Sequence, residues 1–101
     1  MKNFDNAQLF LLKSYEKNPT SEIENLLALN YFELGEFEKA NEIFSHLAEK
    51  NSINTAILLN RAKCYEKLSD FSAAKKQLKK ALKIFPEFEE AKELLEKIKN
   101  M

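Results

Sequence analysis

The feature that most constrains this chain is a pattern that returns after 34 residues. The stretch NYFELGEFEKANEIF at 30–44 is followed by CYEKLSDFSAAKKQL at 64–78. Five positions coincide: Tyr31 with Tyr65, Leu34 with Leu68, Phe37 with Phe71, Ala40 with Ala74, and Phe44 with Leu78. A fixed period of this length is typical of repeat architectures, in which each unit buries its apolar face against its neighbours.

Within each unit, the apolar residues indicate helices rather than strands, because they recur every three or four positions. The chain has one Gly, two Pro and no Val, a composition that disfavours sheets. Six helices are predicted, over residues 4–17, 21–34, 37–50, 55–68, 71–84 and 87–99. The short connections between them make sequential helices antiparallel neighbours.

Local signals indicate where these helices begin and end. Ser21, with Glu24 three residues later, predicts a capping box at the start of the second helix. Gly35 is expected to end that helix in the left-handed conformation, which a residue without Cβ adopts freely. Asn54 and Asp70 are expected to be the N-caps of the fourth and fifth helices.

The 34-residue helix–turn–helix period resembles the tetratricopeptide repeat, whose pattern is W-x2-L-G-x2-Y, then A-x3-F, then P. The matching residues are Leu27, Ala28, Tyr31, Ala40 and Phe44 in the first unit, and Ala62, Tyr65, Ala74, Leu78 and Pro86 in the second. The pattern is incomplete, since Glu24 and Leu58 replace Trp and Arg61 replaces the first Leu. The resemblance implies an all-α fold of helix–turn–helix repeats, stacked as a short right-handed α-solenoid of about six antiparallel helices.

The same resemblance divides the chain, which is expected to form a single domain over 1–101. A half repeat of one helix is expected at 3–19, where Phe4, Ala7 and Leu11 match positions of the later units. Full repeats follow at 21–54 and 55–86, and a C-terminal capping helix at 87–100. Small residues at the closest helix crossings, Ala28 against Ala40 and Ala62 against Ala74, are expected to let the paired helices approach.

Repeats of this family stack with a concave face lined by the first helix of each pair. The implied peptide-binding groove consists of Asn25, Leu29, Phe32, Glu33, Leu59, Asn60, Lys63, Glu66 and Lys67, and the last helix would add Glu90, Glu93, Leu94 and Lys97. Two interpretations of Leu29 and Phe32 are open. Both lie off the apolar stripe of their helix, so they either contact a bound peptide or pack on a neighbouring helix.

Co-chaperone members of the family bind a C-terminal carboxylate with Lys, Asn and Arg side chains. Asn60 matches the central Asn of that site. The other places hold Asn25, Leu29, Glu90 and Leu94, none of which supplies a cation, so this site is not expected here.

The charges cancel overall but are unevenly distributed, with a net charge of −5 over residues 21–54 and +6 over 55–86. The fifth helix carries two rows of lysines: Lys75, Lys76, Lys79, Lys80 and Lys83. They either contact an acidic protein, a phosphate backbone or anionic lipid, or form a solvated outer face. No aromatic residues interleave with them to stack bases, so a nucleic-acid partner is not expected.

Catalytic signals are missing from the sequence. His46 is expected to be exposed, with no Cys, Ser or acid constellation around it, and Gly35 is the only glycine, so no glycine-rich phosphate loop exists. Cys64 is expected in the core. It has no second cysteine to pair with, and the absence of a disulfide favours a cytoplasmic protein. The sequence therefore predicts no enzyme activity, no cofactor and no metal site, and its apolar runs are too short for a membrane span.

The predicted function is a non-enzymatic protein–protein interaction module that binds a peptide or helix of a partner protein in the concave groove. The alternative is a structural or assembly role through the unpaired N-terminal helix. Leu9, Phe10 and Leu12 lie off its packed stripe and would be buried against another copy, giving a homo-oligomer, or against an upstream part of a longer protein.

Overall fold

The structure, a computed structural model, describes residues 4–101, which contain six α-helices and no strand. The helices are α1 (Phe4–Lys17), α2 (Ser21–Glu33), α3 (Phe37–Lys50), α4 (Thr55–Lys67), α5 (Phe71–Ile84) and α6 (Glu89–Lys99). Residue 3, the predicted start of the half repeat, and the side chain of Phe4 lie outside the described part. None of the helices in the described range is long and apolar enough to cross a membrane.

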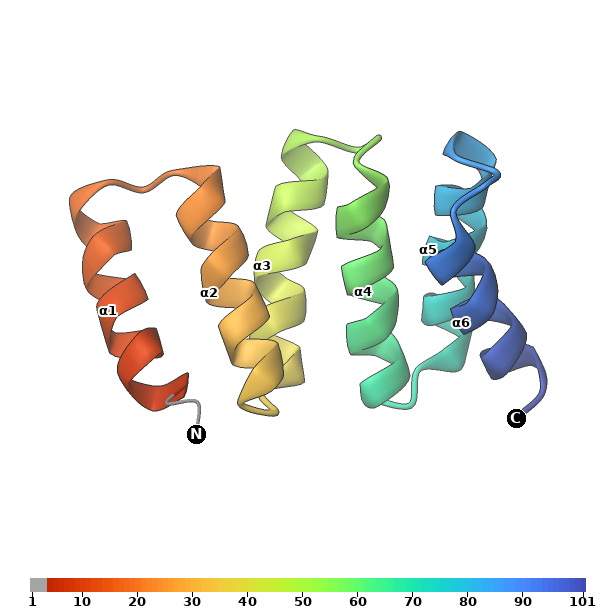
Figure 1. The fold of residues 1–101 in the computed structure, drawn as a ribbon, viewed down its shortest axis with the longest axis horizontal. Helices are drawn as coiled ribbons and strands as arrows, with labels where there is room; N and C mark the ends of the chain where they lie inside the picture. The colour runs from red at the N-terminus through yellow and green to blue at the C-terminus, as the bar shows by residue number, and fades with distance from the viewer. Residues whose placement is uncertain (1–3) are drawn as a thin grey trace.

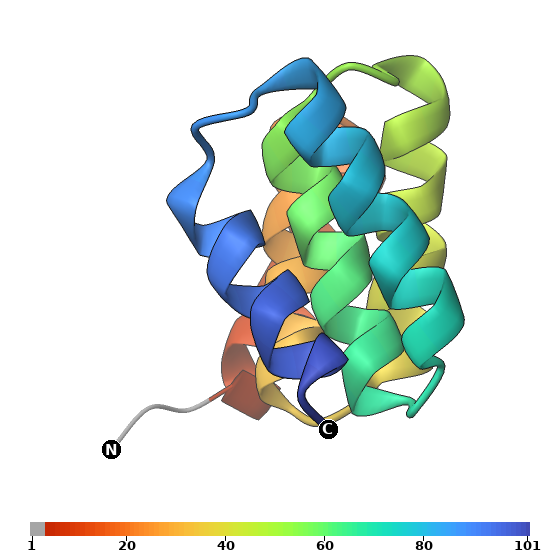
Figure 2. The same cartoon turned by 90° about the vertical axis from the view of Figure 1, so that its right-hand side faces the viewer.

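The helices follow one another in a row, and each packs chiefly on its neighbours in the sequence (Figure 1). Seen from the end of the row, α3 and α5 lie on one side of the stack, while α2, α4 and α6 lie on the other (Figure 2). The molecule measures 40 × 28 × 21 Å along its principal axes. This stacking confirms the predicted all-α solenoid of antiparallel helices.

Similar corners connect α2 to α3 and α4 to α5. Gly35 has φ +81° and Ser69, 34 residues later, has φ +62°. In both corners the next residue donates its N–H to a carbonyl five residues back, over 2.9 Å, which is the Schellman arrangement. The prediction for Gly35 is confirmed, and the second corner places a serine in the same left-handed conformation.

The predicted N-caps of α4 and α5 are confirmed. The side-chain oxygens of Asn54 and Asp70 each accept a hydrogen bond from the backbone N–H three residues ahead, at 3.2 Å. These bonds satisfy donors that the first turn of a helix leaves without an intrahelical partner.

The capping box predicted for α2 is wrong. Thr20, not Ser21, is the N-cap, and its hydroxyl accepts from the N–H of Ile23 at 3.2 Å. Glu24 does not fold back on the cap, because its carboxylate is bound by side chains of α3. The start of α6 also differs by two residues, since the helix begins at Glu89 with Phe88 as a cap that makes no side-chain hydrogen bond.

The core consists of two buried clusters that run along the stack. One contains Ala28, Ala40, Phe44, Leu47 and Cys64, and the other Leu59, Ala62, Ala74, Leu78, Ala91, Leu95 and Ile98. Each predicted alanine pair is fully buried within a single cluster. The four small side chains therefore lie in the core, each pair within the cluster that its two helices share.

Candidate functional site

Three hollows lie along the side of the stack that α2, α4 and α6 form. The central hollow is lined by Leu29, Phe32, Glu33, Phe44, Asn60 and Lys63. The α4–α6 hollow is lined by Phe32, Lys63, Glu66, Lys67, Glu90, Glu93, Leu94 and Lys97. The helix-start hollow is lined by Ser21, Glu22, Asn25, Leu47, Asn54, Ala56, Ile57 and Asn60. Because shared residues join neighbouring hollows, the three form one continuous surface, which we call the groove.

Eight of the nine residues that the sequence assigns to a groove line these hollows: Asn25, Leu29, Phe32, Glu33, Asn60, Lys63, Glu66 and Lys67. Four of them come from α2 and four from α4, which lie on the same side of the stack (Figure 2). Whether a peptide binds them stays a prediction.

Leu59 does not belong to the groove surface. Its side chain is only 4% exposed and packs in the second core cluster, among residues of α4, α5 and α6. The assignment from the sequence is wrong at this position because an interior helix of the stack is buried on more than one side. Leu59 and the adjacent Leu58 therefore both face neighbouring helices.

Leu29 and Phe32 differ in how much of each side chain packs on a neighbouring helix. Leu29 is 39% exposed and lines the central hollow. Phe32 is half-buried, and its ring meets that of Phe37 edge-on at a centroid distance of 5.0 Å. Because Phe32 also lines two hollows, it both packs against α3 and presents apolar surface to the groove.

Two ion pairs span the α4–α6 hollow. Lys63 Nζ donates to Glu90 Oε2 at 2.8 Å, and Lys97 Nζ lies 3.0 Å from Glu66 Oε2. In each pair one partner comes from α4 and the other from α6. Two of the cations in the groove are therefore already engaged by carboxylates of the same chain.

Several lining residues were missed by sequence reasoning. Phe44 closes the central hollow from α3, and its apolar character marks it only as core. Ile57 lines the helix-start hollow although it also packs on the first cluster. No signal in the sequence separates a side chain that is wholly buried from one that forms the wall of a hollow.

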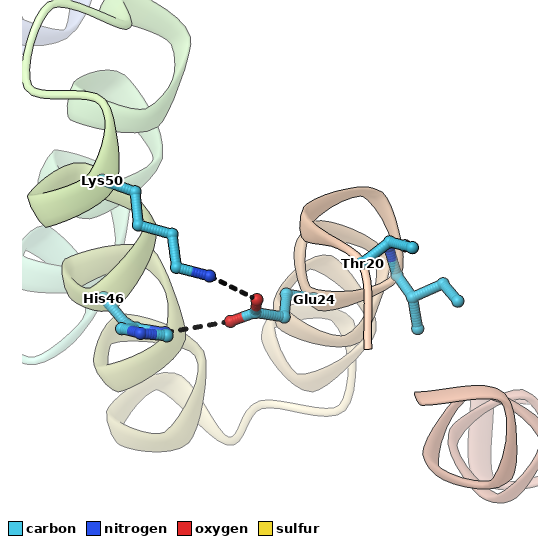
Figure 3. A network of polar contacts seen from close by, with 5 residues as sticks. Thr20, Glu24, His46 and Lys50 are labelled. Carbon is cyan, nitrogen blue, oxygen red and sulfur yellow. Dashed lines mark hydrogen bonds and ion pairs between the residues drawn. The ribbon is translucent and has the colours of Figure 1, made fainter. Parts of the chain in front are cut away.

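A buried carboxylate joins α2 to α3 on another part of the surface (Figure 3). Glu24 is 5% exposed; Lys50 Nζ donates to its Oε1 at 3.1 Å, and His46 Nδ1 lies 3.0 Å from its Oε2. Burial alone would raise the pKa of the Glu24 carboxyl, but hydrogen bonds from Lys50 and His46 outweigh it and hold the pKa below its ordinary value. The side chain of His46 is exposed, as predicted, and its contact with Glu24 was not indicated by the sequence.

Reactive chemistry finds little support in the described residues. No three His, Cys, Asp or Glu side chains among residues 4–101 are grouped so that they could hold a metal ion. Cys64 is fully buried, as predicted, and burial raises the pKa of its thiol to about 12. The thiol is therefore uncharged and a poor nucleophile at neutral pH.

Known structures share this fold. The first TPR of Spaghetti (RPAP3), bound to the HSP90 peptide SRMEEVD, matches with a TM-score of 0.85 at 24% identity, covering 96% of this chain and 78% of that one. The first TPR domain of human RPAP3 has a TM-score of 0.84 at 24% identity, covering 96% and 77%. The Arabidopsis OM64 TPR domain has a TM-score of 0.84 at 19% identity, covering 96% and 81%. At such identities the likeness establishes the fold alone.

Sequence comparison adds the family. No curated protein sequence matches the chain. The family model described as Tetratricopeptide repeat matches residues 31–98, which is more than half of the chain and includes all five pairs of coinciding positions. The chain therefore belongs to the tetratricopeptide repeat family.

Proposed function

We propose that the groove binds a peptide or helix of a partner protein, and that the chain acts as a non-enzymatic interaction module. The observation that carries this proposal is apolar surface at Leu29 and Phe32 within a groove lined mainly by polar side chains. Apolar groups that stay in contact with water on a rigid scaffold gain free energy when a partner covers them. The TPR fold supports the proposal, since a neighbour of the same fold was solved with a bound peptide.

The partner is not expected to resemble that neighbour's peptide, whose last four residues, EEVD, include three acidic ones. At the places where co-chaperone members bind a carboxylate, this chain offers Asn60 but no cation. Glu90 occupies one such place, and it holds Lys63 in an ion pair. An acidic C-terminus would therefore meet a carboxylate where it needs a positive charge.

Substitution within the groove tests the proposal. The chain is immobilised and used to capture partners from a lysate of the cells that produce it, alongside Leu29→Ala and the double variant Leu29→Ala with Phe32→Ala. Both variants should retain helicity and lose the captured partner. Ile84→Ala is the control, because Ile84 is exposed to a similar degree, 42% against 39%, but lies on α5 outside the groove. Equal capture by all four proteins would refute the groove.

Unfolding of the double variant would show that Phe32 acts as core through its contact with Phe37. Leu29→Ala then decides the question alone, because Leu29 is more exposed and its loss removes little packing.

A second candidate function is self-association through α1. Leu9 is 60% exposed, Phe10 70% and Leu12 41%, which is unusual exposure for large apolar side chains on one helix. A second copy that packs on α1 would cover them. Sedimentation of the chain over a range of concentrations tests this, with Phe10→Glu as the variant. A monomer at every concentration would exclude it.

A further inference from the structure

Each hollow of the groove contains one carboxylate that has no ion-pair partner among residues 4–101. Glu22 lines the helix-start hollow, Glu33 the central hollow and Glu93 the α4–α6 hollow. All three side chains are exposed to solvent. Every ion pair recorded for the groove uses other acids, namely Glu66 and Glu90.

Most cations of the groove, in contrast, are already in ion pairs. Lys63 and Lys97 are each held by a carboxylate, which leaves Lys67 as the one lysine of the groove without an ion pair in the described part of the chain. An incoming ligand therefore meets three unpaired carboxylates and one unpaired ammonium group. The unpaired charge that the groove presents is net negative, although the chain as a whole is neutral.

We propose that the partner of this groove is a basic and apolar protein segment, in which Lys or Arg side chains flank a large apolar residue. This inference rests on the proposed function, since it requires that the groove bind a peptide. The apolar residue would lie in the central hollow against Leu29 and Phe32, where both line the wall. The flanking cations would then reach Glu33 in the same hollow and Glu22 or Glu93 in the adjoining ones.

The charge pattern also explains which segments the groove rejects. An acidic segment would leave its carboxylates beside those of Glu33 and Glu93, and like charges brought together at a binding surface oppose association. Apart from Lys67, it could gain a lysine only by displacing Glu90 or Glu66 from an ion pair. Selection against acidic segments thus follows from the same residues that favour basic ones.

Selection from a library of random linear peptides, displayed on phage and applied to the immobilised chain, tests the inference. We expect the enriched peptides to be net positive, with Lys or Arg next to Phe, Leu, Ile or Met. Their binding should weaken as salt is added, because exposed charge pairs are screened. Glu33→Gln should weaken a selected peptide by about twofold to fivefold, the range measured for exposed ion pairs.

Glu49→Gln is the matched control, because Glu49 is exposed on α3 and lines none of the three hollows. It should leave binding unchanged. Enriched peptides that depend on Leu29 but are acidic or uncharged would overturn the inference and leave the proposed function standing. If no enriched peptide loses affinity with Leu29→Ala, the groove itself fails, and the proposed function fails with it.

Discussion

At the scale of single residues, Cys64 shows how burial decides chemistry. Its side chain is fully buried, and burial raises the pKa of the thiol to about 12. Since the thiolate is the reactive form, we expect the folded protein to resist alkylating and disulfide reagents at neutral pH. The measurement is the labelling rate with and without denaturant. Rapid labelling of the folded protein would show that the first core cluster opens readily.

The two corners at Gly35 and Ser69 share the same backbone hydrogen bond but place different residues at positive φ. Replacing Ser69 by Gly removes the strain of a Cβ in the left-handed conformation, and we expect it to raise the free energy of unfolding by about 0.5 to 1 kcal/mol. Gly35→Ala should lower it by about 1 kcal/mol, through backbone strain alone, because a Cβ there meets nothing within 4 Å.

Urea unfolding of both variants measures these changes. Ser45→Gly provides the control, since Ser45 lies within α3, where glycine costs conformational entropy and should destabilise the fold. If Ser69→Gly were as destabilising as Ser45→Gly, the left-handed corner would not be strained.

At the scale of elements, the Glu24 cluster ties α2 to α3. The pKa of Glu24 lies below its ordinary value of 4.5, so its ionised form stabilises the fold above about that pH. This contribution is lost as the pH falls through the lowered pKa. Glu24→Gln should reduce the free energy of unfolding at neutral pH by about 1 to 2 kcal/mol, because a neutral amide binds Lys50 more weakly than a carboxylate does.

Chemical unfolding of wild type and Glu24→Gln, repeated from neutral to acidic pH, checks both claims. The difference between the two proteins should shrink on acidification, since a protonated Glu24 resembles Gln. Glu49→Gln, at an exposed position of α3, should show no such trend. A difference that stayed constant with pH would mean that the ionised carboxylate is not what stabilises the contact.

The sequence predicted the elements well where their signals are local. The helix ranges follow from apolar spacing, and Gly35, Asn54 and Asp70 define their ends, because a cap needs only residues within one turn. Prediction failed where a distant partner competes. The local pattern at Ser21 and Glu24 predicts a capping box, yet the carboxylate binds side chains of α3 that lie more than twenty residues away.

At the scale of the whole molecule, the position of the groove could be predicted, but the ion pairs along it could not. The resemblance to the tetratricopeptide repeat implies which helices line the concave face, and eight of the nine residues assigned in this way line the hollows. The ion pairs Lys63–Glu90 and Lys97–Glu66 could not be assigned from the sequence, because long side chains on separate helices have several possible partners. Leu59 was misassigned for a related reason, since the period does not say how many neighbours cover one helix.

Stacked repeats are stabilised mainly by contacts between neighbours, so the ends of the row should open before its middle. The end helix α1 packs chiefly on α2, and among its described side chains the buried one is that of Gln8, which accepts a hydrogen bond from Asn30 at 2.7 Å. In contrast, α4 is packed between α3 and α5 and contains Leu58 with no exposed surface. We expect amide protons of α1 to exchange at least roughly tenfold faster than those of α4.

Hydrogen exchange measured at several protein concentrations tests whether a second copy of the chain packs on the exposed face of α1. If a second copy packs on Leu9 and Phe10, exchange in α1 should slow as the concentration rises, while exchange in α4 stays constant, because association stabilises only the covered element. Exchange in α1 that is independent of concentration means that no second copy binds there. Equal protection of α1 and α4 in a dilute monomer would contradict the nearest-neighbour view, because it requires the row to open as one cooperative unit.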